Sequence, residues 1–213
     1  MSVVDFASHL ATLDRELVIH TDDGVEMRTV VIRQHYPTSV EDLWDACTSA
    51  DRLPRWFLPV AGDLQLGGRY QFEGNAGGTI EQCEAPGFLR ATWEYGEGIS
   101  WLELRMTAAG DGSQLELRHI APLNDFWSQF GPGAVGVGWN LGLLGLGLYL
   151  DSGESLDRAR VEQATMGPDG IRFMVDSSNA WAEAAIAAGE DATWAREAAA
   201  RTTEFYTGVP PES

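Results

Sequence analysis

The longest apolar segment of the chain runs from Gly131 to Leu150 and contains no charged residue. Within it, apolar side chains recur at intervals of four, three and four positions, which places them on one face of a helix. This row consists of Trp139, Leu143, Leu146 and Leu150. A second apolar row is Leu141, Leu144 and Leu148, and a thin row of Gly138, Gly142 and Gly145 lets another surface approach closely. The pattern predicts a helix that begins near Gly133 and is buried from several sides.

Alternation of apolar and polar residues upstream of this helix predicts antiparallel strands. Two β-rich runs flank the turn signal Asp23-Gly24 and indicate a hairpin that ends near Tyr36. Five further candidate strands, separated by turns rich in Gly and Pro, are residues 63–74, 77–85, 87–96, 100–108 and 113–121. One face of the last two carries Leu102, Leu104, Met106, Leu115, Leu117 and His119. Glu and Arg occupy the other face, so we expect one covered and one solvated side.

Three further segments are predicted to be helical. Thr38 or Ser39 caps an amphipathic helix whose first turn carries Glu41 and Asp42. The last sixty residues are Ala-rich and predict helices over 170–189 and 191–208, the second capped by Asp191 and ended near Gly208. Their expected apolar stripes are Ile171, Met174, Val175, Trp181 and Ile186, and Trp194, Ala198 and Phe205. We interpret these helices as an appendage that covers part of the domain; a partner-binding arm is the alternative.

Two other interpretations of residues 131–150 are disfavoured. A membrane span needs about 20 mainly apolar residues, but seven of these twenty are Gly, Asn140 interrupts the segment, and Asp151 follows it. Gly131, Gly133 and Gly136 fit the spacing of a dinucleotide-binding loop. That loop requires a preceding parallel strand, and none is predicted there. A buried helix is therefore the preferred interpretation.

Composition narrows the classes of partner. The 213 residues carry a formal charge of −18, which argues against binding to nucleic acid or to anionic membrane surfaces. The amino terminus lacks the basic start and long apolar core of a secretory signal, so we expect a cytoplasmic protein. Cys47 and Cys83 have no metal-like spacing and are expected to be reduced thiols, with a disulfide as the minority alternative. No pattern indicates a metal or a cofactor.

The order of these elements resembles a known family. Four segments carry the resemblance: "YPTSVEDLWDACTSADRLPRWFLP", "GDLQLGGRYQFEG", "ATWEYG" and "GWNLGLLGLGLYL". In this order they are similar to the SRPBCC (START-like) superfamily, in the branch of the activator of the heat shock protein 90 ATPase. The resemblance covers residues 28–151, with residues 1–27 before it and a helical extension over 152–213. It implies an α+β helix-grip fold, in which a curved antiparallel sheet surrounds the long helix with a hydrophobic cavity between them.

Candidate site residues are mainly the aromatic residues of the resembling region. Tyr and Trp give an apolar pocket a few directional contacts, although a cavity liner and a core residue have the same sequence pattern. His119, with Asp125 after it, fits acid/base chemistry, and Asn140 fits a ligand contact; a hydrogen-bonded core residue is the preferred interpretation of both. The candidate ligand-binding residues are Trp56, Phe57, Tyr70, Phe72, Trp93, Tyr95, His119, Trp139, Asn140 and Leu143. No catalytic residue is assigned.

Three functions remain open, because this superfamily supports many functions on one scaffold. The preferred hypothesis is a module that binds a small apolar molecule between sheet and long helix. The second, implied by the family resemblance, is an adaptor linked to a chaperone and to the stress response, with a chaperone or a second copy of the chain as partner. The third is a cyclase- or hydrolase-like enzyme, which would need a polar cluster in the pocket.

Overall fold

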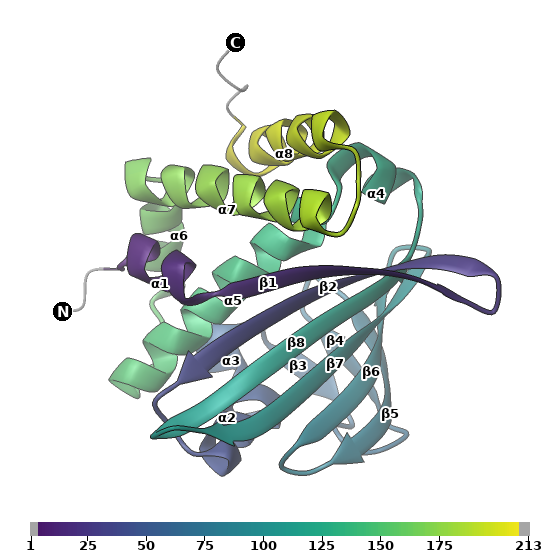
Figure 1. Ribbon diagram of the computed structural model, residues 1–213. Helices are drawn as coiled ribbons and strands as arrows, with labels where there is room; N and C mark the ends of the chain where they lie inside the picture. The colour runs from purple at the N-terminus through teal and green to yellow at the C-terminus, as the bar shows by residue number, and fades with distance from the viewer. Residues whose placement is uncertain (1–3, 209–213) are drawn as a thin grey trace. The chain divides into compact units, whose positions relative to one another are not determined.

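The computed structural model describes residues 4–208. Its sheet contains eight strands in the order β1-β2-β8-β7-β6-β5-β4-β3 (Figure 1). The strands are β1 (Asp14–Asp22), β2 (Val25–Tyr36), β3 (Val60–Gly62), β4 (Arg69–Phe72), β5 (Gly77–Glu84), β6 (Phe88–Tyr95), β7 (Gly98–Ala109) and β8 (Gly112–Pro122). The helices are α1 (Phe6–Thr12), α2 (Val40–Thr48), α3 (Leu53–Trp56), α4 (Asp125–Phe130), α5 (Gly133–Ser152), α6 (Arg158–Thr165), α7 (Pro168–Ala187) and α8 (Ala192–Thr207). The expected α+β class is confirmed.

The chain divides into two compact units that do not follow the order of the sequence. The first unit contains residues 4–30, 122–144 and 157–208, and the second contains Val31–Ala121 and Gly145–Leu156. Strand β2 and helix α5 therefore each contribute to both units. The family resemblance predicts a domain over residues 28–151, with one segment before it and a helical extension after it. These bounds stay a prediction.

The second unit confirms the expected inner face of the sheet. Strands β7 and β8 pair with Leu102 opposite His119, Leu104 opposite Leu117, and Met106 opposite Leu115. All six side chains are buried, because alternation along each strand directs them to the same side. The hairpin at Asp23-Gly24 also forms, and both residues adopt the positive φ that this turn requires.

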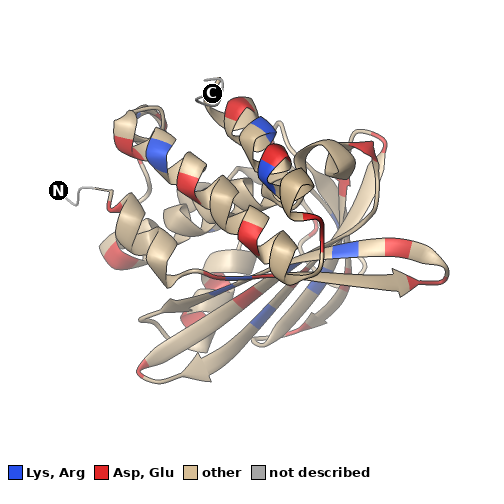
Figure 2. Ribbon diagram, turned by 45° about the horizontal axis from the view of Figure 1, so that its top comes forward, with Lys and Arg blue, Asp and Glu red and all other residues tan. Residues whose placement is uncertain are grey.

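The opposite face of these strands carries a network of ion pairs. Glu103 contacts Arg90 at 2.7 Å and Arg105 at 3.3 Å, and Glu116 contacts Arg33 at 2.7 Å and Arg118 at 3.5 Å. Figure 2 marks the arginine positions in blue and the glutamate positions in red. Glu103 is therefore buried, although its position in the alternation belongs to the solvated face, because arginine side chains cover it.

In the first unit, buried side chains of α7 recur at four-residue intervals, at Phe173, Ser177 and Trp181. Phe173 packs on Phe6 of α1, with ring centroids 5.4 Å apart, and Trp181 is fully buried against Gly136 of α5. A methyl group at position 136 would overlap the Trp181 indole, so glycine is required for this close approach. Helix α8 lies beside α7 (Figure 1). As predicted, it begins after Asp191, whose side chain accepts from the Trp194 amide, and ends at Gly208.

Helix α5 is a buried core helix of the protein. It is long and apolar enough to cross a membrane, but 56% of its most apolar window is buried within the protein. Its observed start at Gly133 is the predicted one. The thin glycine row also allows close approach, since a Cβ atom at Gly145 would lie 2.9 Å from the Trp56 carbonyl oxygen in the second unit.

Several predicted details are wrong. Phe205 is 57% exposed, and the buried face of α8 is formed instead by Ala195, Ala198, Ala199 and Thr202. The strand expected over residues 63–74 is reduced to β4, because residues 63–68 form a loop in which the Gly68 amide donates to the Gln65 carbonyl. Four short helices, α1, α3, α4 and α6, were not predicted.

Candidate functional site

Six of the candidate residues form a continuous aromatic row in the second unit. We use this name for Trp56, Phe57, Tyr70, Phe72, Trp93 and His119. Trp56 ends α3 and Phe57 follows it, Tyr70 and Phe72 come from β4, Trp93 comes from β6 and His119 from β8. Since β4, β6 and β8 are alternate strands of the sheet, the row extends across five neighbouring strands.

Ring contacts link the members of this row in sequence. The centroid of Phe57 lies 5.5 Å from that of Trp56 and 5.1 Å from that of Phe72. Phe72 is followed by Trp93 at 5.8 Å, and Trp93 by His119 at 6.2 Å; Tyr70 joins at Phe72, 5.5 Å away. Edge-to-face and tilted geometries predominate, which are the arrangements that aromatic pairs prefer. The row is therefore packed and ordered.

The aromatic row rests on a buried apolar cluster but is itself covered unevenly. Tyr70 and Phe72 belong to the buried cluster, together with Leu53, Ile80 and Ala91. Trp56, Phe57 and Trp93 pack against that cluster and are only partly buried. Three of the largest apolar side chains of this unit are thus only partly buried, although they pack on a buried cluster.

Polar atoms of the row are used within the protein. The Tyr70 hydroxyl donates to the Thr92 carbonyl at 2.6 Å, and the Trp56 indole N–H donates to the Ala46 carbonyl at 2.9 Å. Burial lowers the pKa of His119 to about 4, so its imidazole is neutral near pH 7. The rings therefore present apolar and aromatic surface without a formal charge.

The row itself contains one imidazole and one phenol hydroxyl, but no carboxylate or thiol. Asp125, the residue considered as a partner of His119, lies in the first turn of α4, in the other unit. Both cysteines are free thiols, as expected, and burial raises the pKa of the Cys47 thiol to about 12, which makes it a poor nucleophile. Within residues 4–208, no group of three His, Cys, Asp or Glu side chains is placed to hold a metal ion.

Four candidate residues lie apart from the row. Tyr95 is on the same strand as Trp93 but is 66% exposed at the strand end. Trp139, Asn140 and Leu143 belong to the half of α5 that forms part of the first unit. Leu143 is buried and Trp139 half-buried there. Their expected role as ligand contacts stays a prediction.

Asn140 is fully buried, and its amide belongs to a polar network of the first unit. We assign the amide so that its oxygen accepts from Arg15 Nε at 3.3 Å and from Ser177 Oγ at 2.5 Å, while its nitrogen donates to the Gly136 carbonyl at 3.1 Å. The reverse assignment would set the amide nitrogen against the Arg15 donor. His9 Nε2 lies 3.2 Å from the backbone carbonyl oxygen of Asn140. These contacts favour the interpretation of Asn140 as a hydrogen-bonded core residue.

Sequence reasoning missed the apolar residues that surround the row. Leu53, Leu58, Val60, Leu64, Ile80 and Leu89 complete the cluster on which the aromatic side chains pack. Leu89 is the one of these residues that shares a strand with a member of the row, and its position four residues before Trp93 on β6 is the signal that identifies it, since residues two or four apart share a face. Leu64 lies in a loop, where periodicity gives no such signal.

The neutral state of His119 predicts a loss of stability in acid. The pKa is about 4 in the folded protein and about 6.5 in an unfolded chain. Between these values the unfolded chain binds a proton that the folded protein excludes, so stability is full above pH 6.5 and falls as pH decreases toward 4. The loss is about 3 kcal/mol at most. Urea unfolding at several pH values should show it, and His119→Gln should reduce it; an equal pH dependence in both proteins would contradict the assignment.

The sheet, the long helix and the aromatic row define a protein of the helix-grip α+β class. Residues 37–150 match the family described as "Activator of Hsp90 ATPase homolog 1-like protein". The crystal structure of CalU16 from Micromonospora echinospora is similar at 34% identity, covering 81% of this chain and 97% of that one, with a TM-score of 0.67. The solution structure of CalU16 gives 33% identity, coverage of 83% and 97%, and a TM-score of 0.70.

A more distant likeness concerns the fold alone. Protein MLL2253 from Mesorhizobium loti is 20% identical, covers 59% of this chain and 98% of that one, and has a TM-score of 0.53. No curated protein sequence matches the chain. The protein belongs to the Activator of Hsp90 ATPase homolog 1-like family, within the SRPBCC superfamily. Its likeness to CalU16 extends beyond residues 37–150, since it covers a larger share of the chain than that range.

Proposed function

We propose that the protein binds a small, uncharged apolar molecule against the aromatic row. The observation that carries this proposal is the partial exposure of Trp56, Phe57 and Trp93 on a buried apolar cluster. Exposed apolar area is unfavourable by about 25 cal/mol per Å², so an apolar ligand that covers these rings gains that free energy. Small-molecule sites are commonly lined in this way, by aromatic side chains with few polar groups.

The charge state of the row supports an uncharged ligand. The Tyr70 hydroxyl and the Trp56 N–H already donate to carbonyl groups of the protein, and the His119 imidazole is neutral near pH 7. A charged ligand would lose its hydration without gaining an opposite charge from the row. A neutral apolar ligand loses little hydration free energy, and if it is aromatic its ring can stack on the indole and phenyl rings.

Fluorescence titration with N-phenyl-1-naphthylamine, an uncharged aromatic probe, tests this proposal. We expect saturable binding that quenches tryptophan emission. Trp93→Phe should weaken binding roughly two- to tenfold, because one aromatic contact contributes about 0.5 to 1.5 kcal/mol.

Trp101→Phe is the matched control. Trp101 lies on β7 opposite Thr92, so it occupies the face of the sheet opposite to that of Trp93. It should therefore leave the affinity unchanged. The proposal fails if the probe shows no saturable binding, or if the two variants bind it equally well.

A further inference from the structure

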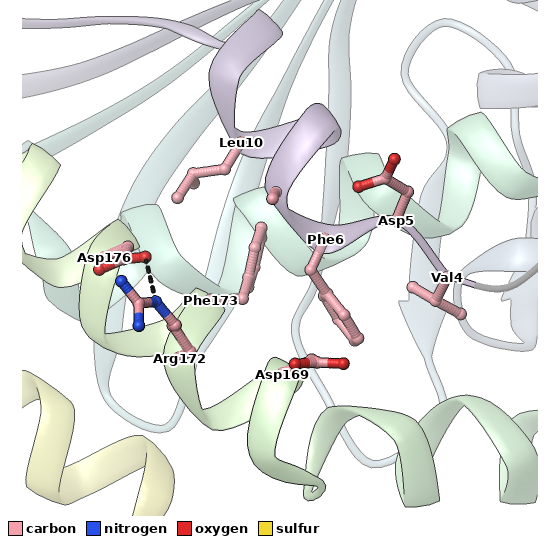
Figure 3. Close-up of a pocket in the computed structure, with 9 residues that line it drawn as sticks. Val4, Asp5, Phe6, Leu10, Asp169, Arg172, Phe173 and Asp176 are labelled. Carbon is pink, nitrogen blue, oxygen red and sulfur yellow. Dashed lines mark ion pairs between the residues drawn. The ribbon is translucent and has the colours of Figure 1, made fainter.

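A pocket lies between α1 and the first half of α7, within the first unit. It has a volume of about 450 Å³, in the range of about 300 to 1,000 Å³ that is usual for small-molecule sites. Figure 3 shows side chains from both helices that line it. None of its lining residues belongs to the aromatic row, so the two candidate sites have no residue in common.

The interior surface of this pocket is apolar. Phe6 of α1 and Phe173 of α7 are 7% and 2% exposed, and their rings lie 5.4 Å apart with an interplanar angle of 49°. Val4, which precedes α1, and Leu10 of α1 extend the apolar lining (Figure 3). Phe6 and Phe173 are almost fully buried, so the apolar surface open to a ligand is mainly that of Val4 and Leu10, and a ligand needs an apolar body to cover it.

The charged side chains of the pocket are mainly carboxylates. Asp5, Asp169 and Asp176 line it together with one cation, Arg172. Arg172 Nε pairs with Asp176 at 3.5 Å, one helical turn away, so these two charges offset each other. Asp169 has no ion-pair partner within the part of the chain that the structure describes. Two negative charges therefore remain uncompensated at the pocket.

The state of Asp5 supports this charge count. Its side chain accepts hydrogen bonds from the Ser8 amide at 2.9 Å and from the Ser8 hydroxyl at 2.7 Å. The hydrogen bond from the Ser8 amide is the largest of the effects that hold the pKa of Asp5 below its usual value, and the hydrogen bond from the Ser8 hydroxyl acts in the same direction. With both oxygens engaged, Asp5 adds negative potential, whereas Asp169 is left to contact a ligand directly.

An apolar lining beside two carboxylates without an ion-pair partner among the described residues disfavours anionic ligands and favours cationic ones. An anion would face two uncompensated carboxylates on a protein whose formal charge is −18. A cation is attracted by the same carboxylates. We propose that the pocket binds a small organic cation, in which an ammonium group lies near Asp169 and an aromatic or alkyl body lies on the apolar lining that Val4 and Leu10 leave open above Phe6 and Phe173.

The test is an NMR titration of the whole chain with benzyltrimethylammonium. We expect saturable shifts of the amide signals of α1 and the first half of α7. Benzyl alcohol and phenylacetate present the same ring without charge and with a negative charge, and both should bind at least about fivefold more weakly, because neither is attracted by the Asp169 carboxylate. Added salt should weaken binding of the cation.

Two variants with opposite expected effects separate binding from loss of structure. Asp169→Asn should weaken the cation about fivefold, whereas Arg172→Gln, which removes the opposing charge, should tighten it. Glu183→Gln is the control, because it removes one charge from an exposed position on the same helix outside the pocket, and it should leave the affinity unchanged. The proposal is overturned if the cation binds no better than benzyl alcohol, if its shifts lie outside α1 and α7, or if Asp169→Asn and Arg172→Gln both match the wild type.

Discussion

Replacing Trp181 by alanine is expected to lower the free energy of unfolding by about 3 to 5 kcal/mol, the usual range for truncating a buried tryptophan. Trp181 has no exposed surface, and its indole is the part of α7 that packs against the glycine at position 136. The substitution leaves a cavity at a contact where α5 offers no side chain to fill it. Urea unfolding followed by circular dichroism measures the change without relying on the fluorescence of the deleted residue.

Phe205→Ala is the matched control for this experiment. It also deletes an aromatic ring from the C-terminal helices, but Phe205 is 57% exposed. A change within about 1 kcal/mol is expected for it, because little area returns to water. If Trp181→Ala unfolds at the wild-type midpoint with the wild-type slope, the packing of α7 on α5 is not as described.

The second large effect is expected for Leu146→Ala, at about 2 to 5 kcal/mol. Leu146 lies in the half of α5 that forms part of the second unit, and it is fully buried. The surrounding side chains can relax only partly into the space left by the missing methyl groups, so both burial and packing are lost. Leu66→Ala, at a position 63% exposed in the same unit, should be almost neutral. Equal unfolding midpoints for the two variants would show that the apolar stripe of α5 is misassigned.

Strong periodicity explains which parts of the fold were predictable. The start of α5 at Gly133 and the inner face of β7 and β8 follow directly from long, regular apolar patterns. Asp191 and Gly208 also mark the ends of α8, because a side-chain cap and a glycine with positive φ satisfy the free ends of a helix by local chemistry. These signals do not depend on contacts between distant residues.

Helices rich in small and polar residues were harder to orient. The buried stripe of α7 includes Ser177, which bonds to Asn140 of α5, a contact that the sequence does not reveal. On α8, alanines carry the buried face, and their small apolar area gives a weak pattern beside the large ring of Phe205. Tertiary contacts fix the rotation of both helices, and sequence spacing alone cannot supply it.

The candidate site was predictable to the extent that strand alternation determines it. Tyr70, Phe72, Trp93 and His119 meet because the same side of alternate strands faces the same direction. Tyr95 obeys the same alternation but lies at the strand end, beyond the cluster that buries its neighbours. Alternation along a strand indicates the side of the sheet on which a side chain lies. Whether other side chains bury it on that side can be read only from the structure.

The composition of the first unit has a consequence for the order in which the protein is made. Residues 4–30 are synthesised before the segments that they contact, since Phe6 packs on Phe173 of α7 and Arg28 pairs with Glu190. At about 5 to 20 residues per second, roughly 10 to 35 s pass before those contacts can form. During this interval β1, an edge strand of the finished sheet, has no late-made helix to pack against. Residues 4–30 therefore depend on protection from aggregation until these later segments have been made.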